Sequence, residues 1–442
     1  MATTKVVVIG AASASFGPAM IGDALLTPEL RGSTLVLVDI DGPRLEVMAA
    51  FARRLNQALG GGWRIEHTTD RRQALPDASF VITAIAVRRD ELWQLDFQIP
   101  LKHGIKQVLG ENGGPGGLSH SLRNIPLILD IVRDMEQLCP RALLLNFSNP
   151  ESRICLAVSR YTAQPFVGLC HGVAMGYASV AQLTGVPVDD ITGPCGGLNH
   201  LGWFTQLRRK STGEDLYPLL RAADQTYDPE YLPLTRALLR TFGLYPYPSD
   251  DHVGEYLAYA WEICGLEGYD FARAEQRRQQ QWARIQRIAM GEEEVPVAET
   301  LISDEVASPA EGRPRLRPSG EFAFPIIAAI ATGREAYIPA VNLRNDGLID
   351  NLPSWAVVEV PAIAGPDGLR GVPIGPLPAG IAAICNTQVA VQDLAVDAAV
   401  KGSRQLALQA LLVDPVVPSL SAAERTLDEL LAVHKPYLPT FC

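Results

Sequence analysis

The chain has 442 residues, of which 47% are apolar and 20% are charged, and its formal net charge at pH 7 is −11. This composition is that of a globular protein with two or three domains, and the negative charge excludes a general basic surface for nucleic acid or an anionic membrane. We find no signal-peptide pattern and no apolar stretch of the ~20 residues that a membrane span needs. Seven scattered cysteines favour reduced thiols, so we expect a cytoplasmic protein.

The first forty residues predict a dinucleotide-binding βαβ unit. An apolar strand over residues 5–10 leads through a turn of small residues into a helix over 18–26, and a second strand ends at Asp39. The small residues allow the backbone to approach a pyrophosphate at the helix N-terminus, and Asp39 would accept hydrogen bonds from ribose hydroxyls, which favours NAD over NADP. However, Ala12 and Ser15 replace glycines of the G-x-G-x-x-G motif. A doubly wound domain whose first turn binds nothing is therefore the alternative.

Further elements follow from the apolar patterns along the chain. We expect helices over residues 43–60 and 119–136, an edge strand over 64–68, and core strands over 80–86, 142–147 and 166–169. Loops are expected over 87–91, which is charged, over 111–117, which is rich in glycine, and over 291–317. Strands are also expected over 205–210 and 356–361, mostly helical structure over 215–300, and one long helical region over 381–412 that serves core and subunit packing.

These elements predict an α/β protein of the lactate and malate dehydrogenase type. A Rossmann-type doubly wound sheet would occupy residues 1–195, and a mixed α+β domain with substrate, metal and oligomer contacts would occupy residues 196–442. Ligands of such sheets bind at the carboxyl ends of the strands. The cofactor contacts that we expect there are Gly10, Ser13, Ser15, Phe16, Asp39, Arg44, Ala84 and Asn146.

Two further groups of residues are candidates for chemistry. Cys170 and His200 each follow an apolar run, and a thiolate with an imidazole suits Mn²⁺, Fe²⁺, Co²⁺ or Zn²⁺ while leaving positions open for substrate. A cysteine and a histidine that lie apart in the sequence are also common core residues, so their spacing does not distinguish a metal site from core packing. Residues 249–256 gather several titratable groups, which form either a helix N-cap or an acid–base pair.

A set of short motifs resembles glycoside hydrolase family 4 in order and spacing, over nearly the whole chain. The motifs lie at residues 10–16, 39–41, 113–117, 146–150, 168–171, 199–203, 351–353, 358–361 and 388–414. This resemblance implies an O-glycosyl hydrolase that uses NAD and a divalent metal such as Mn²⁺, in contrast to glycosidases with two carboxylates. The usual two-glycine first turn of the family is replaced by Ala11-Ala12.

The resemblance also implies a mechanism. NAD⁺ would take a hydride from C3 of the sugar, the metal would polarise the resulting ketone, and a base would remove the acidified C2 proton. The leaving group at C1 would then depart, water would add, and the hydride would return to C3. Cys170 and His200 would be the metal ligands, Tyr256 the base and His171 a group that assists the leaving group. Asp251 is a further catalytic candidate; an ordinary packed aromatic is the alternative for Tyr256.

The Cys-His-Gly sequence at residues 170–172 resembles family members that act on non-phosphorylated galactosides, glucosides and hexuronides, and the related NAD-dependent sulfoquinovosidases. Substrate contacts are predicted for Asn149, Arg88, Glu111, His120, Arg123 and His252. Five basic residues could bind a carboxylate or sulfonate of the substrate: Arg88, Arg89, Lys102, His120 and Arg123. The alternative is that they bind the NAD pyrophosphate or face solvent. An NAD-dependent hydroxy-acid or polyol dehydrogenase and a nucleotide-sensing protein are the alternative functions. We expect a homodimer or homotetramer.

Overall fold

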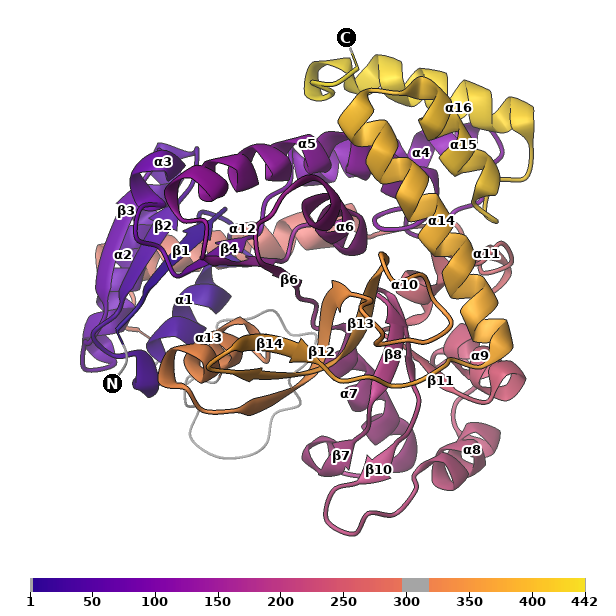
Figure 1. The fold of residues 1–442 in the computed structure, drawn as a ribbon, viewed down its shortest axis with the longest axis horizontal. Helices are drawn as coiled ribbons and strands as arrows, with labels where there is room; N and C mark the ends of the chain where they lie inside the picture. The colour runs from indigo at the N-terminus through magenta and orange to yellow at the C-terminus, as the bar shows by residue number, and fades with distance from the viewer. Residues whose placement is uncertain (1–2, 296–317, 442) are drawn as a thin grey trace.

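The computed structural model of the chain describes residues 3–295 and 318–441. Within them, a 12-stranded sheet has the order β11-β9-β8-β13-β12-β6-β5-β4-β1-β2-β3, with β14 paired to β13, while β7 and β10 form a separate pair (Figure 1). The strands are β1 (Lys5–Ile9), β2 (Thr34–Val38), β3 (Arg64–Thr68), β4 (Phe80–Thr83), β5 (Leu143–Asn146), β6 (Phe166–Gly168), β7 (Ile191–Thr192), β8 (Cys195–Leu198), β9 (Leu201–Phe204), β10 (Arg208–Arg209), β11 (Tyr245–Tyr247), β12 (Ala336–Arg344), β13 (Val357–Gly365) and β14 (Gly368–Gly371).

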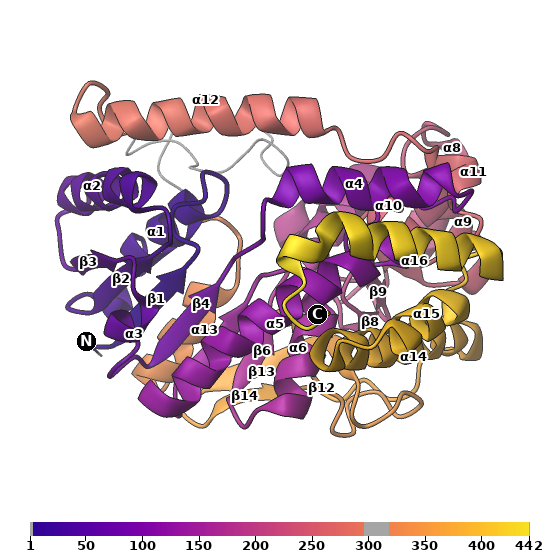
Figure 2. The ribbon, with the colours of Figure 1, turned by 90° about the horizontal axis from the view of Figure 1, so that it is seen from above.

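The helices cover both faces of this sheet and its far end. They are α1 (Gly17–Leu25), α2 (Gly42–Ala58), α3 (Arg71–Ala74), α4 (Arg89–Lys102), α5 (Gly114–Leu138), α6 (Glu151–Tyr161), α7 (Gly172–Thr184), α8 (Tyr217–Thr226), α9 (Pro233–Phe242), α10 (Asp250–Gly254), α11 (Trp261–Cys264), α12 (Phe271–Met290), α13 (Ala323–Thr332), α14 (Ala379–Lys401), α15 (Arg404–Val413) and α16 (Leu420–His434). In Figure 2, α12 runs along the outside of α2, against which it packs.

The first six strands are all parallel and have the Rossmann order 3-2-1-4-5-6, with β3 at the edge. Val6 and Val8 of β1 pack in the core layer that contains α1, α2 and α13, whereas Val7 and Ile9 pack in the layer that contains α5 and α6. Both faces of these strands are therefore buried, as parallel strands require. The predicted doubly wound sheet is confirmed.

The C-terminal half continues the same sheet with antiparallel strands. Asn342 of β12 pairs with Gly168 of β6, and β13, β8, β9 and β11 follow in turn. Two smaller cores surround this extension, one with α9, α10 and α14 and the other with α7 and α8. Strands from both halves of the chain therefore belong to one continuous sheet.

Several local expectations are wrong. Helix α4 begins at Arg89 inside the expected charged loop, and β4 ends at Thr83. The expected strand over residues 205–210 is reduced to the two-residue β10. The long C-terminal helical region is divided, because Gly402 takes a left-handed conformation (φ +62°) and Ser403 caps α15. Strand β12 and helix α13 were not predicted, and most of the expected loop over 291–317 lies outside the described residues.

The glycine-rich stretch is not all loop, because α5 begins at Gly114. Pro115 stands in its first turn, where the missing N–H carries no cost. The carboxylate of Glu255 accepts hydrogen bonds from the three backbone N–H groups just before the helix. A distant acid therefore caps a segment whose own helix propensity is low.

One helix among the described residues, α14, is long and apolar enough to cross a membrane by length and composition alone. This differs from the expectation that no apolar stretch has that length. Half of its most apolar window is buried, and α14 packs against α5, α6 and α15. A core helix passes the same test, so the finding is weak evidence for a membrane span.

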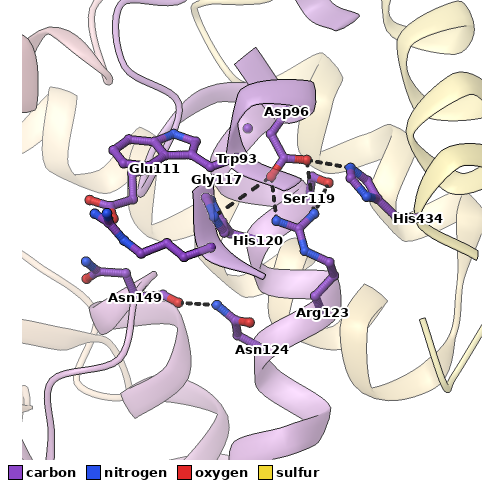
Figure 3. Close-up of polar contacts among 12 residues, drawn as sticks. Trp93, Asp96, Glu111, Gly117, Ser119, His120, Arg123, Asn124, Asn149 and His434 are labelled. Carbon is purple, nitrogen blue, oxygen red and sulfur yellow. Dashed lines mark hydrogen bonds and ion pairs between the residues drawn. The ribbon is translucent and has the colours of Figure 1, made fainter. Parts of the chain in front are cut away.

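A buried ion cluster joins three helices, α4, α5 and α16 (Figure 3). The carboxylate of Asp96 accepts a hydrogen bond from Arg123 Nη1 at 3.0 Å and lies 2.8 Å from His434 Nε2. Ser119 Oγ accepts a second bond from Arg123 Nη1 at 2.8 Å. Burial alone would raise the pKa of Asp96, but Arg123 and His434 outweigh burial and hold it well below its usual range. This cluster ties the C-terminal helix to the start of α5.

We predict that Asp96→Asn destabilises the fold by about 3–5 kcal/mol, because it leaves the Arg123 guanidinium buried without its counter-charge. Asp130→Asn is the matched control, since Asp130 is exposed and pairs with Arg71 at the surface, where an ion pair contributes about 0–1 kcal/mol. Urea denaturation followed by circular dichroism measures both. Equal midpoints for the two variants would contradict the role given to the cluster.

Candidate active site

The carboxyl ends of the parallel strands bring the predicted cofactor and metal residues to one edge of the sheet. Gly10 follows β1, Asp39 follows β2 and Ala84 follows β4. Asn146 ends β5, and Cys170 comes two residues after β6. Because these strands are adjacent and parallel, five positions far apart in the sequence share one edge.

The turn after β1 is shaped for close backbone approach. Gly10 has φ +93°, and a Cβ atom there would lie 2.3 Å from the carbonyl oxygen of Ala84, so only glycine fits. Asp39 Oδ2 accepts a hydrogen bond from the N–H of Ala12 at 2.9 Å, and Ser13 Oγ accepts one from the N–H of Phe16 at 3.2 Å. Asp39 thus shapes the turn from the neighbouring strand. This geometry fits a dinucleotide.

Three other predicted cofactor contacts have partners within the protein. The Arg44 guanidinium lies 3.9 Å from the ring centre of Trp282, and the Phe16 ring packs against the tilted ring of Phe147 with the ring centres 4.8 Å apart. The Asn146 amide is fully buried, accepts a bond from Thr83 Oγ1 at 3.0 Å and donates to the carbonyl of Ser148 at 3.0 Å. For Asn146 and Arg44 these contacts leave the cofactor prediction without support. Ser15 is exposed on the turn.

Cys170 carries a protonated thiol in a polar surrounding. Burial raises the pKa of the thiol, Glu359 raises it further, and the N–H of Gly172 with the side chain of Asn199 partly offsets the shift. Asn199 therefore lies near Cys170, and His200 is the next residue, in the turn of the β8–β9 hairpin.

His200 occupies an unfavourable backbone position. It has φ +63° in the two-residue turn of the hairpin, where asparagine or glycine would cost less, and its side chain is buried. Burial and the nearby His252 lower the pKa of the imidazole. It is neutral at pH 7 and keeps a lone pair for a cation.

The residues present fit a transition metal with an incomplete protein coordination sphere. No group of three or more His, Cys, Asp or Glu that could hold a metal ion gathers in the part of the chain that the structure describes. A soft sulfur and an imidazole nitrogen are donors suited to such ions, and two protein ligands leave positions for substrate oxygens. Two protein ligands would make an open site of the catalytic type and not a closed structural one.

Two residues that the sequence analysis missed surround the His200 imidazole. Asn112 Nδ2 lies 3.2 Å from His200 Nδ1, and Asn112 Oδ1 accepts the N–H of Glu151 at 3.0 Å. Glu255 Oε1 lies 3.6 Å from the same Nδ1 atom. Glu255 was visible only as one acid among several in residues 249–256, and no pattern links it to a loop about 140 positions earlier.

The segment around α10 contributes a cationic histidine. Burial would lower the pKa of His252, but Asp251 reverses this and raises it to about 9. Asp251 Oδ1 lies 2.8 Å from His252 Nδ1, and the His252 ring centre is 4.4 Å from that of His200. The pKa of Asp251 is lowered well below its usual range by His252, against the effect of burial. Asp251 therefore acts on the site through His252.

The predicted base Tyr256 is buried beside the β8–β9 hairpin. Its hydroxyl donates to the carbonyl of Asn199 at 3.2 Å, and burial with the neighbouring Glu255 raises the pKa of the phenol well above its usual value. The predicted leaving-group residue His171 is half exposed and lies 3.4 Å from Glu321. Tyr256 and His171 thus border the hairpin and the end of β6, respectively.

The structure separates the predicted substrate residues into two groups. Glu111 accepts a bond from Arg89 at 2.8 Å, which outweighs burial and lowers the pKa of Glu111 to about 2. The Asn149 carbonyl accepts a bond from Asn124, and its amide points to the side of Glu111 (Figure 3). Glu111 and His252 lie near His200.

The other predicted substrate residues contact protein groups instead. Arg123 and His120 belong to the Asp96 cluster, and burial lowers the pKa of His120 to about 4. Arg88 donates to Tyr437 Oη at 2.7 Å and pairs with Glu91, and Lys102 pairs with Glu429. These contacts leave a direct substrate role for Arg88, His120 and Arg123 without support.

A large cavity of about 1300 Å³ lies at the opposite edge, at the amino ends of β4, β5 and β6. Asp77, Arg141, Gln164, Arg344 and Arg370 are among its lining residues. None of the predicted site residues lines it, so size alone does not identify the functional site.

The fold and the site together are those of a dinucleotide-type α/β enzyme, and comparison with known proteins gives its family. The model for family 4 glycosyl hydrolases matches residues 5–186, and the model for the C-terminal domain of that family matches residues 195–417. The chain belongs to family 4 of the glycosyl hydrolases, as its motifs suggested.

Individual relatives cover nearly the whole chain. An α-glucosidase of Erwinia rhapontici is 34% identical over 98% of this chain and 99% of its own length. An α-galactosidase of Rhizobium meliloti is 32% identical over 100% of this chain and 90% of its own. A crystal structure of a 6-phospho-α-glucosidase from gut microorganisms, in complex with NAD and Mn²⁺, has a TM-score of 0.83, 23% identity and full coverage of both chains.

The expected dehydrogenase-like architecture is also confirmed. A lactate dehydrogenase from a deep-sea metagenome library aligns with a TM-score of 0.52 at 15% identity, over 90% of this chain and 100% of its own. At this identity the likeness concerns the fold alone.

Glu151, the first residue of α6, makes the stability of the folded protein depend on pH. It is buried, and burial raises the pKa of its carboxyl to about 8, although the thiol of Cys155 donates to Oε1 at 3.0 Å. The folded protein therefore keeps a proton that the unfolded chain loses near pH 4.5. Stability from this group is full below that pH and falls by up to about 1.4 kcal/mol per unit as the pH rises towards 8.

We predict that Glu151→Gln, which cannot ionise, is more stable relative to the parent at pH 8 than at pH 5. Thermal unfolding of both proteins at the two pH values gives the difference in melting temperature between variant and parent. The titration of all other groups affects both proteins equally and cancels in this difference. A difference in melting temperature that is the same at both pH values would contradict a protonated Glu151.

Proposed function

We propose that this protein is an NAD- and divalent-metal-dependent glycosidase that hydrolyses glycosides of non-phosphorylated hexoses, anionic ones included, through transient oxidation at C3. The observation that carries the proposal is that Gly10 and Asp39 share one sheet edge with Cys170, and that the side chain of Asn199, the residue before His200, lies near Cys170. Family membership supplies the class of reaction.

The turn at Gly10 and the carboxylate of Asp39 would hold NAD, and Cys170 with His200 would hold Mn²⁺ or a similar ion. When bound, NAD would accept and return a hydride at C3, and the cation would polarise the C3 oxygen so that the C2 proton becomes acidic. A relative's crystal structure with NAD and Mn²⁺ supports this pair of cofactors.

The chain's own residues would then bind the sugar and move protons. Tyr256 lies beside the hairpin and would accept the C2 proton as the phenolate, after its own proton has passed to solvent; a cation bound nearby would favour that ionisation against the effect of burial. His252, kept cationic by Asp251, would donate a hydrogen bond to a substrate oxygen or acidic substituent. His171, half exposed at the end of β6, would assist the leaving group, and the Asn149 amide would bind sugar hydroxyls.

Charge pairing supports a neutral or singly charged sugar. Arg88, Arg89 and Arg123 are each paired with an acid: Glu91, Glu111 and Asp96, respectively. These pairs leave little net positive charge for a phosphate dianion, whereas one imidazolium suits a hydroxyl or a single carboxylate or sulfonate. The names of the two relatives, α-glucosidase and α-galactosidase, make α-glucosides and α-galactosides the first substrates to test.

We also propose a homodimer or homotetramer that packs partly through α15 and α16, where Leu412, Val413, Leu420 and Val433 are exposed. The six cysteines that the structure describes are free thiols, which supports the expected reducing, cytoplasmic compartment. The division into domains at residues 195 and 196 also stays a proposal.

The activity predicts a distinctive assay result. Nitrophenyl α-glucosides, α-galactosides, glucuronides, sulfoquinovosides and 6-phosphoglucosides should be incubated with and without NAD⁺ and Mn²⁺. We expect release of nitrophenol from a non-phosphorylated member only with both cofactors and without net NADH, and slower release from the C2-deuterated substrate. Net NADH would instead favour a dehydrogenase, and full activity without NAD⁺ would contradict the proposed mechanism.

Gly10→Ala tests the nucleotide turn separately. The added Cβ would collide with the carbonyl of Ala84, so we expect NAD⁺ affinity to fall at least tenfold in a fluorescence titration. Gly60→Ala is the matched control, because Gly60 also has positive φ (+86°) but no atom within 4 Å of the added Cβ. Equal NAD⁺ affinities in the two variants would show that the turn does not bind the cofactor.

A further inference from the structure

Aromatic side chains from two parts of the chain hold Arg89, the first residue of α4. Its guanidinium carbon lies 4.6 Å from the ring centre of Trp93 and 5.7 Å from that of Tyr269. The two rings stack with their centres 4.7 Å apart, and Phe271 packs edge-on against both. A planar guanidinium stacks well on aromatic faces, so these contacts restrict its orientation.

Two carboxylates pair with this guanidinium. Arg89 Nη2 donates to Glu111 Oε1 at 2.8 Å, and Nη1 donates to Asp90 Oδ1 at 3.4 Å. Asp90 also pairs with Arg278 of α12, so a helix from the second half of the chain helps to fix the start of α4. Because Arg89 is paired with carboxylates of the protein, it has little charge left for an anionic substrate.

The second oxygen of Glu111 is available as an acceptor. The side chain is 7% exposed, and Oε1 accepts the bond from Arg89. Oε2 accepts no hydrogen bond from the residues that the structure describes, and it is not among their fully buried polar atoms without a partner. An ionised carboxylate has lone pairs on both oxygens, so Oε2 is able to accept a hydrogen bond from a ligand.

Glu111 lies at the candidate active site. It is close enough to His200 and His252 for its charge to act on the pKa of both imidazoles. The Asn149 amide, a predicted contact of the sugar hydroxyls, points to the side of Glu111 (Figure 3). Arg89 thus holds one oxygen of a carboxylate whose other oxygen is open near the predicted substrate residues.

We propose that Arg89 is a positioning residue that holds Glu111 as the acceptor of one sugar hydroxyl. The inference rests on the proposed function, because it assumes that Glu111 contacts the sugar. An ionised carboxylate binds a hydroxyl donor and repels an anionic substituent at the same position. A sugar that lacks this hydroxyl leaves the acceptor unpaired, so the site discriminates against it.

The first test is binding of D-glucose, D-galactose and their monodeoxy forms to the full-length protein with NAD⁺ and Mn²⁺, by isothermal titration calorimetry. We expect the parent to bind one monodeoxy form at least about tenfold more weakly than the sugar itself. Arg89→Met should lose the discrimination at that one hydroxyl and keep the discrimination at the others. Glu111→Gln should lose it at the same position.

A double-mutant cycle tests whether Arg89 acts through Glu111. With a glycoside that the parent hydrolyses, Arg89→Met and Glu111→Gln should each lower kcat/KM about 10- to 100-fold, and the double variant should lose no more than the stronger single one. Arg160→Met is the matched control, because Arg160 also lies over a tryptophan, Trp355, and pairs with a carboxylate, Asp397, at the other end of α6. It should leave kcat/KM unchanged.

Arg89→Lys keeps the proposal testable if Arg89→Met is poorly folded. A lysine retains the positive charge and a donor for Glu111 Oε1, but not the planar group that stacks on Trp93. It should therefore keep more of the hydroxyl discrimination than Arg89→Met, or than Arg89→Gln if only that variant is folded.

The outcomes separate this proposal from the function on which it rests. If the parent neither binds a sugar nor hydrolyses a glycoside, the proposed function is wrong. If the parent does both, the role of Arg89 is overturned when its variants keep the discrimination at every hydroxyl, or when they bind all forms uniformly more weakly. Losses of Arg89→Met and Glu111→Gln that multiply in the double variant would overturn it as well.

Discussion

The junction between β6 and β12 is the constraint on which the site depends. Gly168, Asn342, Glu359 and Gly197 pair in sequence across β6, β12, β13 and β8, so the sheet passes from one half of the chain to the other without a gap. A Cβ atom on Gly168 would lie 1.4 Å from Glu151 Oε1, so a larger residue would displace that carboxyl. Through this row, Cys170 after β6 and His200 after β8 belong to the same continuous sheet, with β12 and β13 between their strands.

The buried acidic side chains and the thiol next to these four paired residues are protonated and carry no negative charge. Burial raises the pKa of Glu359 well above its usual value, and Glu151 raises it further. Together with the raised pKa values of Glu151 and Cys170, this indicates that the polar groups under the site are protonated at neutral pH. A thiol in this surrounding ionises when a cation compensates for lost hydration, as in metal-ligating cysteines. The neutral imidazole of His200 would be the second donor of the proposed site.

Much of the fold could be predicted, because short apolar strands that end in glycine or a polar residue are strong local signals. Gly10, Asp39, Cys170 and His200 were expected at strand ends, and the structure places them there. The side-chain contacts were different. Arg123 lies in a buried pair with Asp96, and Asn146 binds its own loop, because nothing in the spacing shows which buried acid or carbonyl a side chain meets. Glu255 was missed since its three N–H partners lie more than 140 residues away.

The proposed function requires that one cation binds between Cys170 and His200, beside a nucleotide on the turn at Gly10. A crystal structure of the protein grown with NAD⁺ and Mn²⁺, with data collected at the manganese absorption edge, tests it most directly. We expect an anomalous peak within bonding distance of both Cys170 Sγ and an imidazole nitrogen of His200, with the nicotinamide ring next to it. A peak elsewhere, or a thiol and imidazole that share no ion while NAD⁺ is bound, would contradict it.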